Sequence, residues 1–68
     1  MKDPLLGLGQ NIRDFRIKKG LSQEALGRAL KVDKSYISRI ESGKKNLTIK
    51  SLAKVADALS IEIKRLFL

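Results

Sequence analysis

The sequence predicts an all-α fold, a compact single domain of five short helices. Three observations predict this class. Apolar residues recur at helical spacing, and the clearest set is Leu52, Val55, Ala56 and Leu59. Residues that favour helix N-caps precede three of the apolar stretches, and these are Ser22, Asp33 and Thr48. No segment alternates apolar and polar residues for long enough to predict a strand.

The first helix is predicted over residues 8–19, with Gly20 as its C-terminal stop. Its inward-facing apolar residues are Leu8, Ile12 and Phe15. Pro4 discourages an earlier start, so residues 1–8 are expected to form a short arm.

Each of the next three helices is expected to begin at one of the caps. The buried face of the second helix is predicted to be Ala25, Leu26, Ala29 and Leu30. The third helix lies in the stretch 33–43, DKSYISRIESG, where Ile37 and Ile40 are the main apolar anchors. The loop KKNL leads to the fourth helix, and Ser60 can break it. A short fifth helix then contains Ile63, Leu66 and Phe67.

Length and composition exclude several classes of protein. All 68 residues are expected to form one small domain, of a size that hides only about 60% of the surface exposed by the unfolded chain. The sequence has no cysteine and no histidine, which excludes disulfides, ordinary zinc sites and histidine catalysis, and no cofactor is expected. Its apolar runs are too short for a membrane span or a signal peptide, so we expect a soluble cytoplasmic protein.

The strongest compositional feature is charge. Fifteen Lys and Arg against seven Asp and Glu give a net charge of +8 and a pI near 10.2. Such a balance on a short chain favours a polyanionic partner, most often nucleic acid. The alternative is that the charge serves solubility.

The polar face of the third helix indicates what that charge contacts. About three residues separate the second and third helices, which predicts a sharp crossing. Gly27 costs about 1 kcal/mol in helix propensity, and its missing side chain would let the third helix approach closely. With Ile37 and Ile40 anchored below, Lys34 and Arg39 would project outward, and a helix of this length fits the DNA major groove.

The stretch LSQEALGRALKVDKSYISRIESG resembles the helix-turn-helix of the Xre or lambda-repressor-like transcriptional regulators. The resemblance extends from about Leu8 to Phe67 and includes LSQE, YISRIESG and LAKVADAL followed by LF. It implies the compact five-helix lambda-repressor-like fold, with the helix-turn-helix at about residues 22–43. It also implies a sequence-specific regulator that binds double-stranded DNA. The loop KKNLTIKSL is similar to that of restriction–modification controller proteins.

The resemblance also assigns roles to particular positions. Those that match base-reading residues of the recognition helix are Lys34, Ser35, Tyr36 and Arg39. Those that match phosphate-contacting residues are Gln23, Ser42, Lys44 and Lys45. Arg16 and Glu41 match a structural salt bridge between the first and third helices. Each position also has a plainer interpretation: Gln23 and the lysines as solvated residues, and Tyr36 as a residue packed against the second helix.

Two positions depart from the family pattern. Lys31 occupies the turn where many relatives have glycine, so a positive φ there would carry modest strain. Gly27 stands where alanine is commoner. Both changes bear on the angle at which the third helix would dock on DNA.

The C-terminal segment, residues 60–68, is unusually apolar, and exposed apolar patches often mark interfaces. In relatives of this length the last helix often forms a two-fold contact, and the candidate dimer residues are Ile61, Ile63, Phe67 and Leu68. A homodimer would hold two recognition helices one DNA turn, about 34–36 Å, apart on a near-palindromic operator. The alternative is closure of the core, which is the favoured role for Ile61 and Leu66.

Three other classes of function are compatible with a small basic domain to different degrees. An enzyme is not expected, because the acids, lysines and serines show no convincing catalytic arrangement. A single-stranded RNA reader would need more aromatic stacking residues than this chain has. An antitoxin or other protein-interaction module, which binds a partner protein, stays open and does not exclude DNA binding.

Overall fold

The computed structural model describes residues 3–68 and confirms the all-α fold. It contains four α-helices and a final 3₁₀ turn: α1 (Pro4–Lys18), α2 (Gln23–Leu30), α3 (Lys34–Glu41), α4 (Ile49–Ala58) and η1 (Ile63–Phe67). The described residues contain no strand. The expected fifth helix is therefore a five-residue 3₁₀ turn.

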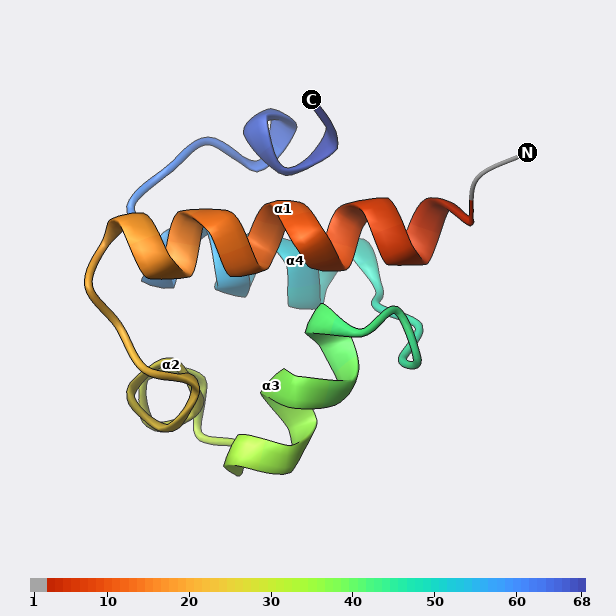
Figure 1. The fold of residues 1–68 in the computed structure, drawn as a ribbon. Helices are drawn as coiled ribbons and strands as arrows, with labels where there is room; N and C mark the ends of the chain where they lie inside the picture. The colour runs from red at the N-terminus through yellow and green to blue at the C-terminus, as the bar shows by residue number, and fades with distance from the viewer. Residues whose placement is uncertain (1–2) are drawn as a thin grey trace.

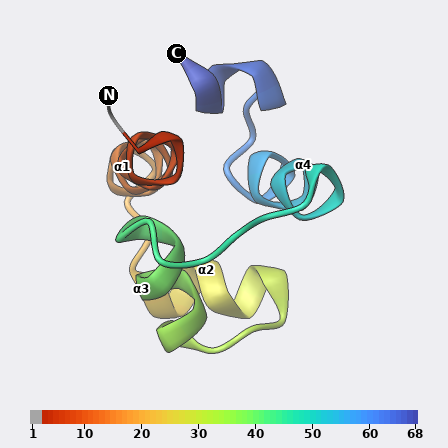
Figure 2. The same ribbon diagram turned by 90° about the vertical axis from the view of Figure 1, so that its right-hand side faces the viewer.

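The other elements are arranged around α1 (Figure 1). α1 crosses the middle, with α2 and α3 on one side of it and η1 on the opposite side. Figure 2, which views α1 along its axis, shows the same division, with α4 lying beside α1. The segment expected to read DNA and the segment expected to form a dimer thus lie on opposite sides of α1.

The predicted start of α1 is wrong by four residues, because the helix begins at Pro4 and not at Leu8. Proline is tolerated at the first helical position, where its missing N–H would have had no partner and its fixed φ suits the helix. Asp3 supplies the cap, since its Oδ1 accepts a hydrogen bond from the Leu5 N–H at 2.9 Å. Most of the expected arm is therefore helix, and Met1 and Lys2 lie outside the described residues.

The other helix ends follow the local chemistry expected from the sequence. The side chains of Ser22, Asp33 and Thr48 accept hydrogen bonds from the backbone N–H groups three residues later, at 2.9–3.0 Å. Gly20, after α1, has a φ of +72°, which glycine adopts at little cost. Each cap satisfies a donor that the first helical turn leaves unpaired.

All four α-helices and η1 contribute to one core. Its buried apolar residues are Ile12, Leu26, Ile37, Ile40, Leu52, Val55, Ala56, Leu59 and Leu66. Full burial of one such large side chain stabilises a fold by about 1.5–3 kcal/mol. This core anchors α3 from beneath and leaves its other face to solvent.

Two glycines permit close backbone approaches around α3. A Cβ on Gly27 would lie 2.7 Å from the carbonyl oxygen of Val32, so the missing side chain accommodates the turn between α2 and α3. A Cβ on Gly9 would collide with the carbonyls of Ile40 and Glu41, which lets α1 pack tightly on the end of α3. The positions of both ends of α3 therefore depend on absent side chains.

Candidate nucleic-acid interface

The turn between α2 and α3 consists of three residues, 31–33. Lys31 has a left-handed conformation, with φ of 61° and ψ of 40°, so the strain expected for a non-glycine residue is present. The Val32 N–H donates to the Gly27 carbonyl at 2.8 Å, and this bond closes the end of α2. The tight turn sets α3 at a steep angle to α2, as Figure 1 shows.

α3 has two distinct faces. Ile37 and Ile40 are 1% and 3% exposed and hold the helix on the core. The predicted base-reading residues Lys34, Ser35 and Arg39 are all exposed on this helix. The structure therefore brings these three polar side chains together on one eight-residue helix.

Tyr36 is half-buried and packs against the core, so the interpretation of this residue as partly structural holds. Lys45 places its Nζ 4.8 Å from the centroid of the Tyr36 ring, within the range of a cation–π interaction. The loop after α3 is thereby connected to the first turn of α3. This contact was not expected from the sequence.

The other residues predicted to contact phosphate differ in their exposure and in their hydrogen bonds. Lys44 is exposed and Lys45 is half-buried. The Ser42 hydroxyl donates to the backbone carbonyls of Ser38 and Arg39, at 3.0 and 3.3 Å, and so reinforces the end of α3. Ser42 therefore has to release these carbonyls before its hydroxyl can donate to a phosphate.

The Arg16–Glu41 salt bridge expected from the sequence is present and buried. Arg16 donates from Nε to Glu41 Oε2 at 2.6 Å and from Nη2 to Oε1 at 3.1 Å, a two-point contact. The side chains are 10% and 4% exposed. The third donor, Nη1, reaches the carbonyl of Leu21 at 2.7 Å. Because every buried side-chain polar atom in the described residues has a partner, the charge pair is fully accommodated.

Gln23 joins this pair, which the sequence did not indicate. Its Nε2 donates to Glu41 Oε1 at 3.1 Å, and the residue is half-buried at the first position of α2. The carboxylate of Glu41 thus receives hydrogen bonds from α1 and from the start of α2.

The candidate dimer residues fall into two groups. Phe67 and Leu68 are 58% and 85% exposed, whereas Ile61 and Ile63 are half-buried against the core. Leu66, expected to close the core, is fully buried. Asn11, which the sequence did not single out, donates from Nδ2 to the carbonyls of Leu66 and Leu68 at 2.8 and 2.9 Å.

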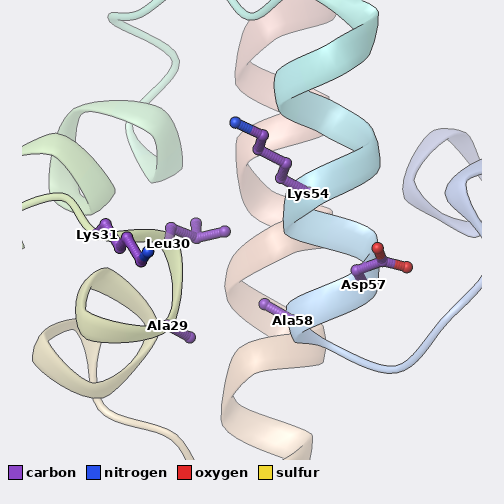
Figure 3. Close-up of a pocket in the computed structure, with 6 residues that line it drawn as sticks. All are labelled: Ala29, Leu30, Lys31, Lys54, Asp57 and Ala58. Carbon is purple, nitrogen blue, oxygen red and sulfur yellow. The ribbon is translucent and has the colours of Figure 1, made fainter.

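A hollow lies elsewhere, between the end of α2 and α4 (Figure 3). It is an open depression of about 480 Å³, lined by Ala29, Leu30, Lys31, Lys54, Asp57 and Ala58. It contains none of the residues predicted to contact DNA or to form the dimer. The described residues hold no cluster of acidic side chains that could bind a metal ion. None of the helices from residue 3 onward has the length and apolar character needed to cross a membrane.

Two short helices joined by a tight three-residue turn, with the second anchored by apolar residues and polar on its outer face, define a helix-turn-helix domain. The chain belongs to the helix-turn-helix family, whose sequence model matches residues 12–66.

Several relatives are similar over most of the chain. The control protein C.MunI of a Mycoplasma species is 34% identical over 68 residues, which cover 98% of this chain and 92% of that protein. The crystal structure of the restriction-modification controller protein C.AhdI from Aeromonas hydrophila has a TM-score of 0.88 and 41% identity, covering 93% and 91% of the two chains. A hypothetical transcription factor of Neisseria meningitidis is 38% identical, covering 90% of this chain and 58% of that protein.

The fold also occurs as part of an enzyme. Hydroxypropylphosphonic acid epoxidase from S. wedmorenis aligns with a TM-score of 0.92 but only 23% identity, over 36% of its length. That likeness concerns the fold alone, since one fold supports unrelated functions. The three relatives of the preceding paragraph are named as a control protein, a controller protein and a transcription factor.

Proposed function

We propose that this chain is a transcriptional regulator that binds a specific double-stranded DNA sequence by placing α3 in the major groove. The observation that carries the proposal is the two-faced character of α3, apolar and buried beneath, polar and exposed outside. An α-helix with its side chains is about 10–12 Å in diameter, and the major groove, about 12 Å wide, admits it. Membership of the helix-turn-helix family supports the same function.

Base recognition is assigned to the exposed residues of α3. Arg39 and Lys34 can donate to the O6 and N7 of guanine, and Ser35 can pair with several bases. Tyr36 can offer its ring edge or hydroxyl to a base or to a thymine methyl. The Lys45 ammonium lies over the face of this ring. Sequence preference in this proposal comes from these four α3 residues together.

Phosphate contacts are assigned to the two ends of the motif. Gln23 lies at the start of α2, where unpaired N–H groups and the helix dipole favour an anion. Lys44 and Lys45 follow α3 and add positive charge, while Ser42 contributes only after its hydroxyl leaves the α3 carbonyls. Such contacts orient the protein and carry no sequence information.

A homodimer is proposed through the C-terminal segment. Exposed Phe67 and Leu68, flanked by the half-buried Ile61 and Ile63, provide an apolar surface on the far side of α1 from α3. The dimer contact and the DNA contact therefore use different surfaces. A two-fold dimer would match a near-palindromic operator with half-sites one turn apart.

Selection of preferred duplexes from a random pool, repeated at two salt concentrations, tests this function. We expect enrichment of a near-palindrome and binding that weakens steeply with salt, because released counterions favour the complex. Salt-sensitive binding without any enriched sequence would contradict the proposal of a specific regulator. A stable protein partner in place of DNA would favour the antitoxin-like alternative.

The narrower proposal is that the protein acts in the cytoplasm as a controller of a restriction–modification system. The support is the match to C.MunI and C.AhdI over nearly the whole of each chain. Reporter fusions of promoters that drive restriction or modification genes and contain the selected operator provide the test. Failure to change expression from such promoters would remove the controller role and leave DNA binding intact.

A further inference from the structure

We propose that Glu41 is a positioning residue for DNA binding, because its buried carboxylate aims the Gln23 amide at the phosphate backbone. The proposal rests on the proposed function and extends it to a residue that itself cannot contact DNA. The Glu41 side chain is only 4% exposed, and its negative charge is repelled by phosphate.

The carboxylate determines which end of the Gln23 amide faces inward. An ionised carboxylate only accepts hydrogen bonds, so the amide oxygen of Gln23 would be repelled from it and the –NH2 group attracted. The 3.1 Å contact from Nε2 to Oε1 has this arrangement. Without Glu41, the two orientations of the amide would differ little in energy, and the side chain would be free to turn.

When the Gln23 –NH2 group faces Glu41, it still has one hydrogen that can be donated to a phosphate. The Gln23 –NH2 carries two hydrogens, and Glu41 Oε1 uses one of them. Phosphate oxygens accept and never donate, so the second hydrogen can bind a phosphate while the first stays on Glu41. Since a bound Gln23 then loses little rotational freedom, the contact forms at a lower entropic cost.

Arg16 cancels the repulsion that a carboxylate near DNA would otherwise exert on the phosphates. Its guanidinium holds both carboxylate oxygens, at 2.6 and 3.1 Å, and neutralises the charge of Glu41. Arg16 also holds the carbonyl of Leu21, in the segment that leads into α2. The same network therefore fixes the backbone just before Gln23 as well as the side chain.

The test is a double-mutant cycle with Gln23→Ala, Glu41→Gln and the double variant. Affinity for the selected duplex is measured by fluorescence anisotropy at a temperature where urea titration shows every variant folded. Gln23→Ala should weaken binding about ten- to a hundredfold, the loss expected for one hydrogen bond to a charged group. Glu41→Gln should weaken binding about threefold in the wild type and by less than about 1.5-fold in the Gln23→Ala background.

The matched control is Glu24→Gln, the same substitution at the residue that follows Gln23. Glu24 forms an exposed pair with Arg28 at 3.8 Å and makes no contact with the buried network. Both Glu→Gln changes remove one negative charge, which by itself favours binding to DNA. Equal or tighter binding by Glu24→Gln beside weaker binding by Glu41→Gln would therefore be a geometric effect.

Several outcomes overturn the proposal. A Glu41→Gln loss of equal size in both backgrounds would make Glu41 merely structural, and wild-type affinity in Gln23→Ala would remove the contact itself. If wild type binds no duplex, the proposed function fails, and the positioning role fails with it.

A measurement on the wild-type protein covers the case in which Glu41→Gln does not fold. NMR of the DNA complex should show nuclear Overhauser contacts between the Gln23 amide hydrogens and the Glu41 side chain. Their absence in the complex, when they are present in the free protein, would mean that Gln23 leaves Glu41 to bind DNA and would refute the proposal.

Discussion

Arg16→Ala is expected to remove most of the stability of this domain. The Glu41 side chain is only 4% exposed, and the variant leaves its carboxylate without a cation and the Leu21 carbonyl without the 2.7 Å bond. Gln23 remains as a neutral donor to Glu41 but cannot balance its charge. Two acceptors that were fully satisfied thus become poorly satisfied in a site that water reaches little.

The expected cost follows from what is left behind. Removing one partner of a buried ion pair typically destabilises a protein by about 3–5 kcal/mol, because the remaining charge stays desolvated. A domain of 68 residues has a total stability of about 3–10 kcal/mol. Arg16→Ala should therefore lower the urea midpoint strongly or unfold the protein at room temperature.

Urea denaturation followed by far-UV circular dichroism measures this effect. The control is Arg28→Ala, another Arg→Ala change within a helix, where the pair with Glu24 is 3.8 Å long and about 70% exposed. Its cost should stay below about 0.5 kcal/mol. A cost below about 1 kcal/mol for Arg16→Ala, or equal costs for both variants, would refute the reasoning that burial decides the effect.

Three further predictions concern DNA, the dimer and the turn. Arg39→Ala should lose about 1–3 kcal/mol on the selected operator and relax its sequence preference, whereas Lys45→Ala should weaken all duplexes alike; equal loss on random DNA would exclude Arg39 as a base reader. Phe67→Ser with Leu68→Ser should give monomers in sedimentation equilibrium with unchanged half-site affinity, and an unchanged dimer would place the interface elsewhere. Lys31→Gly should stabilise the fold by up to about 1 kcal/mol in urea titration, since its φ of 61° suits glycine, and destabilisation would mean that the lysine stem matters more.

Local signals predicted the helix boundaries where a single side chain decides them. Ser22, Asp33 and Thr48 were identified as caps from residue type and spacing, and each forms the expected hydrogen bond. The role of Pro4 does not follow from the sequence, because proline both blocks a helix interior and favours a helix start. The expected last helix is a 3₁₀ turn, since Ser60, with φ of 57°, leaves a short segment after it.

Contacts between distant positions were beyond sequence reasoning unless the family resemblance supplied them. Arg16 and Glu41, 25 positions apart, came from that resemblance. Gln23 was assigned to phosphate, but its bond to Glu41, 18 positions away, depends on how α2 meets α3. The roles proposed for Lys34, Ser35 and Arg39 stay predictions until DNA binding is measured.

The hydrogen bonds of Asn11 indicate that the C-terminal segment folds late and opens early. It bonds to backbone carbonyls 55 and 57 positions away, nearly the full length of the chain. Contacts that close such long loops form late and open early, because the chain entropy that they cost is recovered when they break. We expect amide hydrogen exchange at η1 to be faster than at α2 and α3. A molecule in this partly opened state would keep its helix-turn-helix while losing the apolar C-terminal surface that is proposed for dimerisation.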